Sequence, residues 1–327
     1  MDTNNSMKIG LRLPQTDEHR ATKQNIISLA KEAENAGFDS LWVLERLIWP
    51  IKPLDPYPGT SDGKFPADWQ YIFEPLETLT YVAANTNRIA LGTSVIDMLF
   101  HNPVILARRF ATLDVLSDGR AVCGLGIGWS KDEYKVFNIP FKDRGKRADE
   151  HIQILKSIWT EHIVQFKGQY YNIPASKIGP KPIQKPHIPI YLGGYSQGTF
   201  ARIANYANGW ICVIRNSLNQ VKSYIDNIRN ECYKAKRDPR DIHIAAILYP
   251  KIIDSGNNKD NNKERNEKGS KHRKELLVGS IDQIGKDLQE IKEIGVDHAI
   301  INFNRSSIGN NIDNIIDISK QLSEFIR

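Results

Sequence analysis

The fold of this chain is decided in residues 88–129, which read RIALGTSVIDMLFHNPVILARRFATLDVLSDGRAVCGLGIGW. Two apolar runs within this stretch, residues 89–96 and 121–127, predict strands. Between them Asn102 can cap a helix whose first turn holds Pro103, and a Ser-Asp-Gly turn ends that helix. A strand, a helix and a second strand at this spacing predict a crossover between parallel neighbours.

The carboxyl ends of these two strands are the expected location of the functional site. In a parallel α/β sheet, ligands bind beyond the ends at which the strands finish. Those ends are residues 93–96, which read TSVI, and residues 126–129, which read GIGW. We therefore expect both tetrapeptides to line one ligand site.

The rest of the chain repeats the same alternation of strand and helix patterns. The expected strands cover residues 8–13, 40–44, 89–96, 121–127, 189–192, 209–214, 242–249 and 298–303. A stretch with apolar residues at helical spacing follows each of them. This pattern predicts an α/β fold: a (β/α)8 TIM barrel with insertions after strands 2, 4 and 7, in a single domain over residues 1–327.

Three local features accompany this prediction. A polar loop is expected between Trp129 and about Arg144, and a small hairpin over residues 164–174. Ser280 and Gln283 have the spacing of a capping box at the start of the seventh helix.

An open dinucleotide-binding sheet is the competing architecture. It would place G-x-G-x-x-G at the first turn from strand to helix, where this chain reads PQTD over residues 14–17. The GLGIG motif at residues 124–128 follows the fourth strand and has a different spacing. The barrel is therefore the better prediction.

Composition excludes several classes of protein. The chain is 40% hydrophobic and 25% charged, as in soluble globular proteins. No apolar run approaches the roughly 20 residues of a membrane span, and the N-terminus lacks the pattern of a secretory signal. Cys123, Cys212 and Cys232 are scattered and match no metal-site spacing. We therefore expect a cytoplasmic protein with no metal and no membrane association.

The net charge of +6 is unevenly distributed. Residues 255–275 contain seven Lys or Arg and four Asp or Glu, with no apolar anchor. This composition predicts a solvated loop, and the alternative is a lid that closes over an anionic ligand. Nucleic-acid binding is not expected, because no basic stripe interleaved with aromatic residues occurs elsewhere.

A candidate phosphate site follows the fifth strand. Gly193 and Gly194 leave backbone N–H groups accessible where a helix begins, and Tyr195 and Ser196 complete the turn. Ser196 can cap the helix and donate to a phosphate oxygen. The alternative is a tight turn with a capping serine and no ligand.

Acid–base candidates are few. Glu45 and Arg46 end the second strand, where they form either a catalytic pair or a structural ion pair, and His101 lies in the loop after the third strand. Four aromatic residues are expected either to line an apolar pocket or to anchor a long loop: Trp49, Tyr57, Trp69 and Trp129. No nucleophile with a matching base is present, so a cofactor is expected to supply the chemistry.

Five motifs taken together resemble the bacterial-luciferase-like monooxygenase superfamily, and more narrowly its F420-dependent oxidoreductase branch. They are LWVLERLIWP at residues 41–50, the whole stretch 88–129, FKDRGKRADEHI at 141–152, KPIQKPHIPIYLGGYS at 181–196 and ANGW at 207–210. The resemblance extends more weakly over residues 277–301. It implies a barrel whose deazaflavin or flavin lies across the carboxyl ends of the strands.

The resemblance also implies roles for single residues. The Ser94–Val95 peptide bond is expected to be cis and to support the ring, with Gly128 and Trp129 beside it. Residues 193–196 match the family's phosphate-binding turn. This chain departs from the family pattern in two places. Glu45-Arg46 stands where Asp-His is common, and Trp129 stands where some members have a carboxylate.

The predicted function is therefore an F420-dependent oxidoreductase that transfers a hydride between the deazaflavin and a small-molecule substrate. One alternative is an FMN-dependent luciferase-like monooxygenase, and the other is a non-catalytic flavin-binding or deazaflavin-binding protein. A homodimer is the candidate assembly. In the charged segment, four basic residues are candidate partners for the anionic F420 tail: Lys268, Lys271, Arg273 and Lys274.

Overall fold

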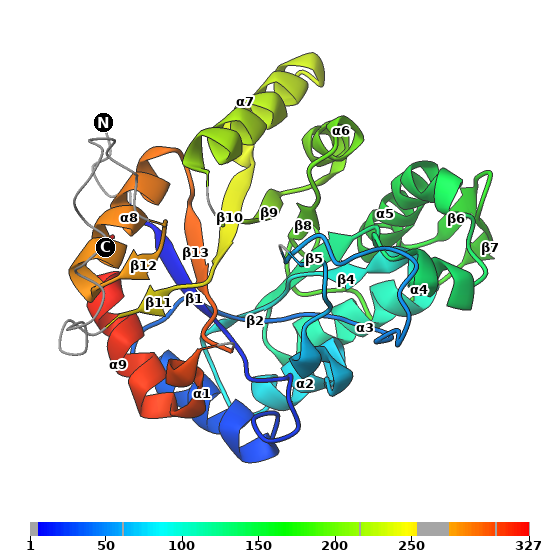
Figure 1. Ribbon diagram of the computed structural model, residues 1–327. Coiled ribbons are helices and arrows are strands. Elements are labelled where there is room, and N and C mark those ends of the chain that lie inside the picture. Colours follow the sequence, from blue (N-terminus) through cyan, green and yellow to red (C-terminus); the bar gives the residue numbers. More distant parts are fainter. Residues whose placement is uncertain (1–5, 61, 216, 254–274, 305, 327) are drawn as a thin grey trace.

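Eight parallel strands close into a barrel surrounded by helices (Figure 1). The structure is a computed structural model that describes residues 6–60, 62–215, 217–253, 275–304 and 306–326. In chain order the barrel strands are β1 (Lys8–Arg12), β2 (Ser40–Val43), β3 (Ala90–Thr93), β5 (Ala121–Gly126), β8 (Ile190–Gly193), β9 (Gly209–Val213), β10 (His243–Leu248) and β13 (His298–Ile301). Pairing between β3 and β5 completes the ring. The predicted (β/α)8 barrel is confirmed.

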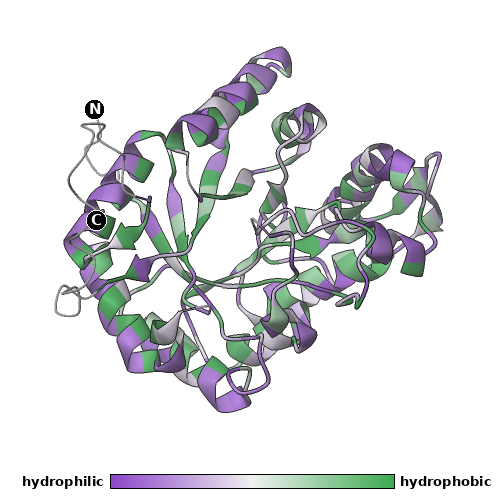
Figure 2. Cartoon of the chain, in the orientation of Figure 1, coloured by the Kyte–Doolittle hydropathy of each residue, from purple (hydrophilic) through white to green (hydrophobic). Residues whose placement is uncertain are grey.

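The barrel helices follow the strands as expected. They are α1 (Lys23–Asn35), α2 (Pro75–Ala83), α3 (Pro103–Leu116), α5 (Arg144–Thr160), α6 (Gln197–Tyr206), α7 (Leu218–Lys234), α8 (Ile281–Glu293) and α9 (Ile312–Ser323). Figure 2 shows hydrophilic residues gathered on the outer helices, as on α7, and hydrophobic residues along the strands. This distribution places one core between strands and helices. A second, smaller core of Trp42, Ile211, Ala245, Ile247 and Ile300 fills the inside of the barrel.

Side-chain caps set the starts of six of these eight helices, and α2 and α5 begin without one. The Asn102 side chain accepts from the N–H groups of Val104 and Ile105, as the sequence predicted. Ser280 accepts from the N–H of Gln283, but the Gln283 amide donates to Asp287 at 3.1 Å instead of reaching back to Ser280. Half of the predicted capping box is therefore present, because the buried Asp287 carboxylate offers Gln283 a charged acceptor.

The third strand is not the single run expected over residues 89–96. β3 ends at Thr93, and a separate β4 (Ile96–Asp97) pairs with the carboxyl end of β5. The Ser94–Val95 bond between them is cis, as the family resemblance implied. Two contacts fix Ser94 at this break. Its N–H donates to Val43 O at 2.7 Å, and its Oγ accepts from Arg12 Nη1 at 2.6 Å.

Insertions follow strands β2, β5 and β10, as predicted. The first spans residues 44–74 and contains the 3-10 helix η1 (Ala67–Gln70). The second was expected to be a polar loop, but it folds into α4 (Lys131–Val136) and η3 (Phe141–Asp143). The sequence missed α4 because a six-residue helix is too short to show a clear periodicity. The third begins with β11 (Lys251–Ile252) and ends with β12 (Val278–Gly279), which pair with each other.

Shorter elements complete the chain. The predicted hairpin forms from β6 (Val164–Lys167) and β7 (Asn172–Ser176) between α5 and β8. Three more 3-10 helices are η2 (Met98–Phe100), η4 (Pro239–Asp241) and η5 (Ser307–Asn310). Residues 255–274, for which a solvated loop or a lid was expected, lie outside the described residues. The three cysteines are buried and unpaired. Of the helices in the described ranges, none is long and apolar enough to span a bilayer.

The contact between β3 and β5 predicts the behaviour of a glycine variant. A Cβ atom at Gly124 would lie 1.7 Å from Thr93 O, so Gly124→Ala must push the two strands apart. We expect a loss of roughly 3 kcal/mol in the free energy of unfolding, the upper range for overpacking, measured by urea denaturation. Gly198→Ala is the control, because the nearest atom to its new Cβ, Ser196 Oγ, is 4.0 Å away. Equal stability of the two variants would contradict this description of the contact between β3 and β5.

Candidate functional site

A cavity of about 490 Å³ opens at the carboxyl ends of the barrel strands. Its volume is in the range of small-molecule sites. Nine of the residues predicted from the sequence line it: Glu45, Arg46, Ser94, Val95, Gly128, Trp129, Gly193, Gly194 and Tyr195. His101 and Ser196 are not among the described residues that form its wall. The barrel thus gathers most of the predicted site into one cavity.

Val95 forms the apolar floor of this cavity between two glycines. An ideal Cβ at Gly126 would lie 2.7 Å from Val95 Cγ2, and one at Gly193 would lie 3.3 Å from Val95 Cγ1. The glycines on β5 and β8 therefore leave the space that the Val95 side chain fills. Arg12 on β1 is 4% exposed and fixes the adjacent Ser94 from the barrel interior. The result is a small apolar platform held at the centre of the barrel mouth.

The turn after β8 leads from this platform into α6. Gly194 has a φ of 124°, which favours glycine, and its carbonyl accepts from Trp210 Nε1 at 2.9 Å. Ser196 caps α6 by accepting from the N–H of Thr199. The Tyr195 hydroxyl accepts from the Val213 N–H at 2.7 Å, which ties the turn to β9. The cap predicted for Ser196 is confirmed, and the residues just before α6, Gly194 and Tyr195, line the cavity.

Glu45 is hydrogen-bonded on both carboxylate oxygens. Its Oε1 lies 2.8 Å from His101 Nε2, and its Oε2 accepts from the Asp97 N–H at 2.9 Å. His101 is thus hydrogen-bonded to a residue of the cavity wall. The catalytic roles predicted for Glu45 and His101 stay predictions.

Arg46 forms a buried ion pair that the sequence did not identify. Its Nε donates to Glu133 Oε1 at 2.8 Å, and its Nη2 contacts Glu133 Oε2. Glu133 lies on α4 and is 0% exposed, and Arg46 is 7% exposed. The Leu47 N–H donates to the same carboxylate at 3.1 Å. Arg46 therefore forms an ion pair with Glu133 and not the expected one with Glu45. The catalytic role predicted for Arg46 stays a prediction.

Asp97 is a cavity residue that sequence reasoning missed. It is the last residue of β4, and its side chain is 13% exposed. Burial raises the pKa of Asp97 to about 6, although the Arg46 charge and the Gly128 N–H both lower it. One feature of the sequence could have indicated Asp97 as a site residue: it is an acidic residue directly after the predicted strand, in the motif VIDML.

Aromatic residues form one part of the cavity wall. Tyr57, Trp69 and Trp129 line it, and Tyr57 packs against the other two at ring distances of 5.0 Å and 5.6 Å. The Arg46 guanidinium lies 5.4 Å from the Trp129 ring centre. Trp49 instead donates to Pro66 O within the insertion. Three of the four aromatic residues thus form a wall, and the fourth braces the loop.

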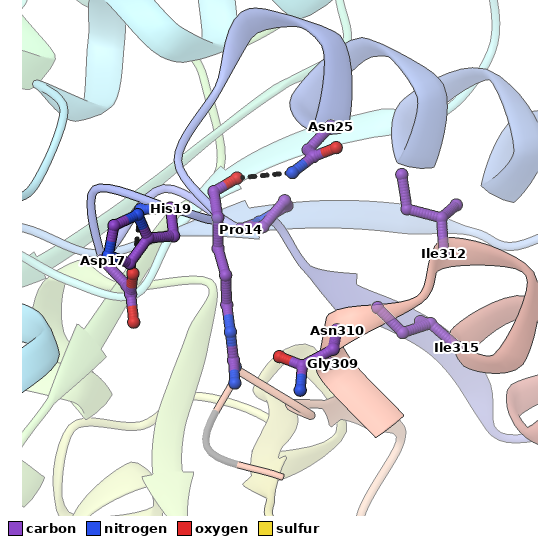
Figure 3. A pocket seen from close by; sticks show the side chains of 9 residues that line it. Pro14, Asp17, His19, Asn25, Gly309, Asn310, Ile312 and Ile315 are labelled. Carbon is purple, nitrogen blue, oxygen red and sulfur yellow. Dashed lines mark hydrogen bonds between the residues drawn. The ribbon is translucent and has the colours of Figure 1, made fainter. Parts of the chain in front are cut away.

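Two further cavities open near the same end of the barrel. One of about 300 Å³ lies between the starts of α1 and α9, where Figure 3 shows Asp17, His19, Asn25 and Asn310 around it. The other, of about 720 Å³, shares Arg215 and Tyr249 with the main cavity and extends toward Lys251. Within the described residues, no cluster of three His, Cys, Asp or Glu side chains could bind a metal ion.

Residues 7–255 match the family described as luciferase-like monooxygenase. The chain belongs to this family. An uncharacterized protein of Mycobacterium tuberculosis is 34% identical over 189 residues, which are 57% of this chain and 67% of that protein. An F420-dependent glucose-6-phosphate dehydrogenase of Amycolatopsis mediterranei is 33% identical over 193 residues. The match covers 58% of this chain and about half of the dehydrogenase, 53%.

Solved structures of the luciferase-like fold superpose on nearly the whole chain. The F420-dependent tetrahydromethanopterin reductase of Methanopyrus kandleri has a TM-score of 0.71 at 18% identity and covers 97% of this chain, with 98% of its own chain aligned. The monooxygenase RslO1 of Streptomyces bottropensis has a TM-score of 0.72 at 19% identity, with 98% of both chains aligned. At these identities the likeness shows the fold alone.

The Arg46–Glu133 pair predicts a large stability effect. Arg46→Met leaves the Glu133 carboxylate buried without its cation, so we expect a loss of about 3–5 kcal/mol in the free energy of unfolding. Arg229→Met is the control, because it removes an exposed pair with Asp226, which is worth about 0–1 kcal/mol. The double variant Arg46→Met/Glu133→Leu should recover much of the loss. Urea denaturation of all four proteins tests this, and an Arg46→Met loss no larger than that of Arg229→Met would contradict it.

Proposed function

We propose that this protein is an F420-dependent oxidoreductase that transfers a hydride between the deazaflavin and a small organic substrate. One observation carries the proposal. The Val95 platform and the Gly193–Tyr195 turn lie side by side in one cavity, because Val95 packs directly against Gly193. An apolar floor next to a glycine turn that leads into a helix fits a ligand with a flat ring system and a phosphate-bearing chain.

Each part of the cofactor has matching residues in this cavity. The ring would lie on Val95, with Ser94, Gly128 and Trp129 at its edges. The phosphate would accept hydrogen bonds from the backbone N–H groups of Gly194 and Tyr195, near the positive end of α6. When bound, the deazaflavin supplies or accepts a hydride. The protein binds and orients the two reactants, and the wall of Tyr57, Trp69 and Trp129 keeps water from them.

Identity to relatives favours F420 as the cofactor. The dehydrogenase that is 33% identical to this chain bears an F420-dependent name. A second F420-dependent glucose-6-phosphate dehydrogenase, from Kineococcus radiotolerans, is 32% identical over 191 residues. The alternative is an FMN-dependent monooxygenase, which the family description of luciferase-like monooxygenase supports.

Spectroscopic titration of the purified protein tests the cofactor assignment. We expect F420 to bind at least tenfold more tightly than FMN, measured by the change in cofactor absorbance or by quenching of its fluorescence. Reduced F420 should then be reoxidised by an organic acceptor in the absence of oxygen. Tighter binding of FMN, with oxygen consumption after its reduction, would favour the monooxygenase. Binding of neither cofactor would refute both.

A glycine variant tests the phosphate turn. Gly194→Val places a branched side chain at a φ of 124° and against Thr199 Oγ1, which lies 3.0 Å from the ideal Cβ. We expect the Kd for F420 to rise by more than tenfold, because the turn must shift and its N–H groups move with it. Gly145→Ala on α5 is the control, since its Cβ meets only the end of the Arg202 side chain at 3.4 Å. An unchanged Kd for Gly194→Val would place the phosphate elsewhere.

A further inference from the structure

The position of Asp97 exposes its carboxyl group to the cavity. An ideal Cβ at Gly126 would lie only 2.8 Å from Asp97 Oδ1. Because position 126 has no side chain, the carboxyl group of Asp97 can lie over the end of β5. Asp97 lines the cavity beside Val95 and Gly128, two of the residues assigned to the ring.

Charged and titratable groups face Asp97 from three sides. From the end of β2, Glu45 accepts the Asp97 N–H at 2.9 Å, and Arg46 Nη2 lies 3.8 Å from Asp97 Oδ2. From the loop after η2, His101 binds the far oxygen of Glu45. From α4, Glu133 pairs with Arg46, and the Tyr134 hydroxyl donates to Ile127 O.

This arrangement raises the affinity of Asp97 for a proton. Arg46 has its short contacts with Glu133 and only a longer one with Asp97, so its charge is already partly balanced. Glu45 adds negative charge close to the Asp97 backbone. Together with burial, these effects disfavour the carboxylate form and raise the pKa of Asp97 to about 6.

Glu45, Arg46 and His101 are less suited to proton exchange than Asp97. Both oxygens of Glu45 have protein partners within 2.9 Å. Arg46 stays protonated near neutral pH, and His101 is not among the described residues of the wall. Asp97 and Glu45 are the carboxyl groups among the described residues of the wall. A general acid must be accessible to the substrate and close to neutral in pKa.

We propose that Asp97 is the catalytic residue that gives a proton to the substrate oxygen, and that the substrate is a carbonyl compound or the corresponding alcohol. This inference rests on the proposed function. In the direction of reduction, the substrate carbon receives a hydride and its electron pair, and the C=O π bond opens. The oxygen then forms its O–H bond with the proton from Asp97. The Asp97 carboxylate that remains faces Arg46 and regains a proton from solvent. Alcohol oxidation follows the same path in reverse.

Two readouts on the full-length protein test this role. The first needs no cofactor: infrared difference spectroscopy over pH 4–8 should show a protonated-carboxyl C=O band that disappears near pH 6. This band should be missing in Asp97→Asn and retained in Asp226→Asn, an exposed control on α7. A wild-type band that already disappears below pH 5, or the same band in Asp97→Asn, would overturn the proposal.

The second readout is the pH profile of carbonyl reduction by reduced F420, with a panel of aliphatic and aromatic ketones and aldehydes as probes. In the wild type the rate should fall as pH rises through about 6, because Asp97 loses its proton. Asp97→Asn should bind F420 with a Kd within threefold of wild type, lose roughly 100-fold or more in kcat, and show no such fall. Asp97→Glu should recover part of the rate and keep a pH-dependent limb.

The outcomes separate this inference from the proposed function. If the wild type does not bind F420, the proposed function fails and the inference fails with it. If F420 binds but Asp97→Asn keeps the wild-type rate and pH profile, or if no carbonyl compound reoxidises the reduced cofactor, only the inference is overturned. Gly126→Ala gives a second variant should Asp97→Asn not fold. By pressing on Asp97 Oδ1 it should shift the infrared titration, and an unshifted titration would contradict the assigned position.

Discussion

The close approach of β3 to β5 is the constraint on which the rest of this site depends. Thr93 Oγ1 donates to Gly124 O at 2.7 Å and accepts from the Gly124 N–H at 3.0 Å, so no side chain fits at position 124. β3 ends at this contact, and the chain crosses to the end of β5 as β4. That crossing places Val95 on the floor of the cavity and Asp97 on its wall. A regular strand over residues 89–96 would do neither.

Burial of charge is the second organising feature. Arg46, Glu133 and Asp97 lie within one low-dielectric cluster next to a mostly apolar cavity. Removing charged groups from water is costly, and the Arg46–Glu133 pair offsets this by its short contacts. Among the described residues Asp97 has no equally close cation, and burial raises its pKa. The same cluster thus joins α4 to the end of β2. It also contains Asp97, the proposed general acid, whose pKa is raised.

Apolar periodicity and turn chemistry were enough to predict the barrel from the sequence. The two strands on either side of α3, β3 and β5, are parallel neighbours as predicted. The Ser196 side chain caps α6 as predicted. Most residues of the cavity wall could be predicted from the barrel alone. The carboxyl ends of all its strands lie at one end of the barrel, even when they are far apart in the sequence. The family resemblance supplied the cis bond at Ser94–Val95.

The sequence could not show which polar residues face one another. Asp97 follows an apolar run directly, and its orientation depends on the break at Ser94–Val95 that local patterns do not reveal. Glu133 is 87 residues from Arg46 and lies on a helix too short to predict. Arg12 is the last residue of β1, and its contact with Ser94 spans 82 residues. Each of these contacts is set by the closure of the barrel rather than by local sequence.

An experimental structure of the protein with bound F420 is the most direct test of the proposed cofactor site. We predict that the deazaflavin ring lies on Val95 and that its phosphate accepts hydrogen bonds from the N–H groups of Gly194 and Tyr195. The Asp97 carboxyl group should face the open side of the ring, where a substrate binds. A ring bound away from Val95, for example in the cavity between α1 and α9, or a phosphate held without Gly194 and Tyr195, would contradict this assignment.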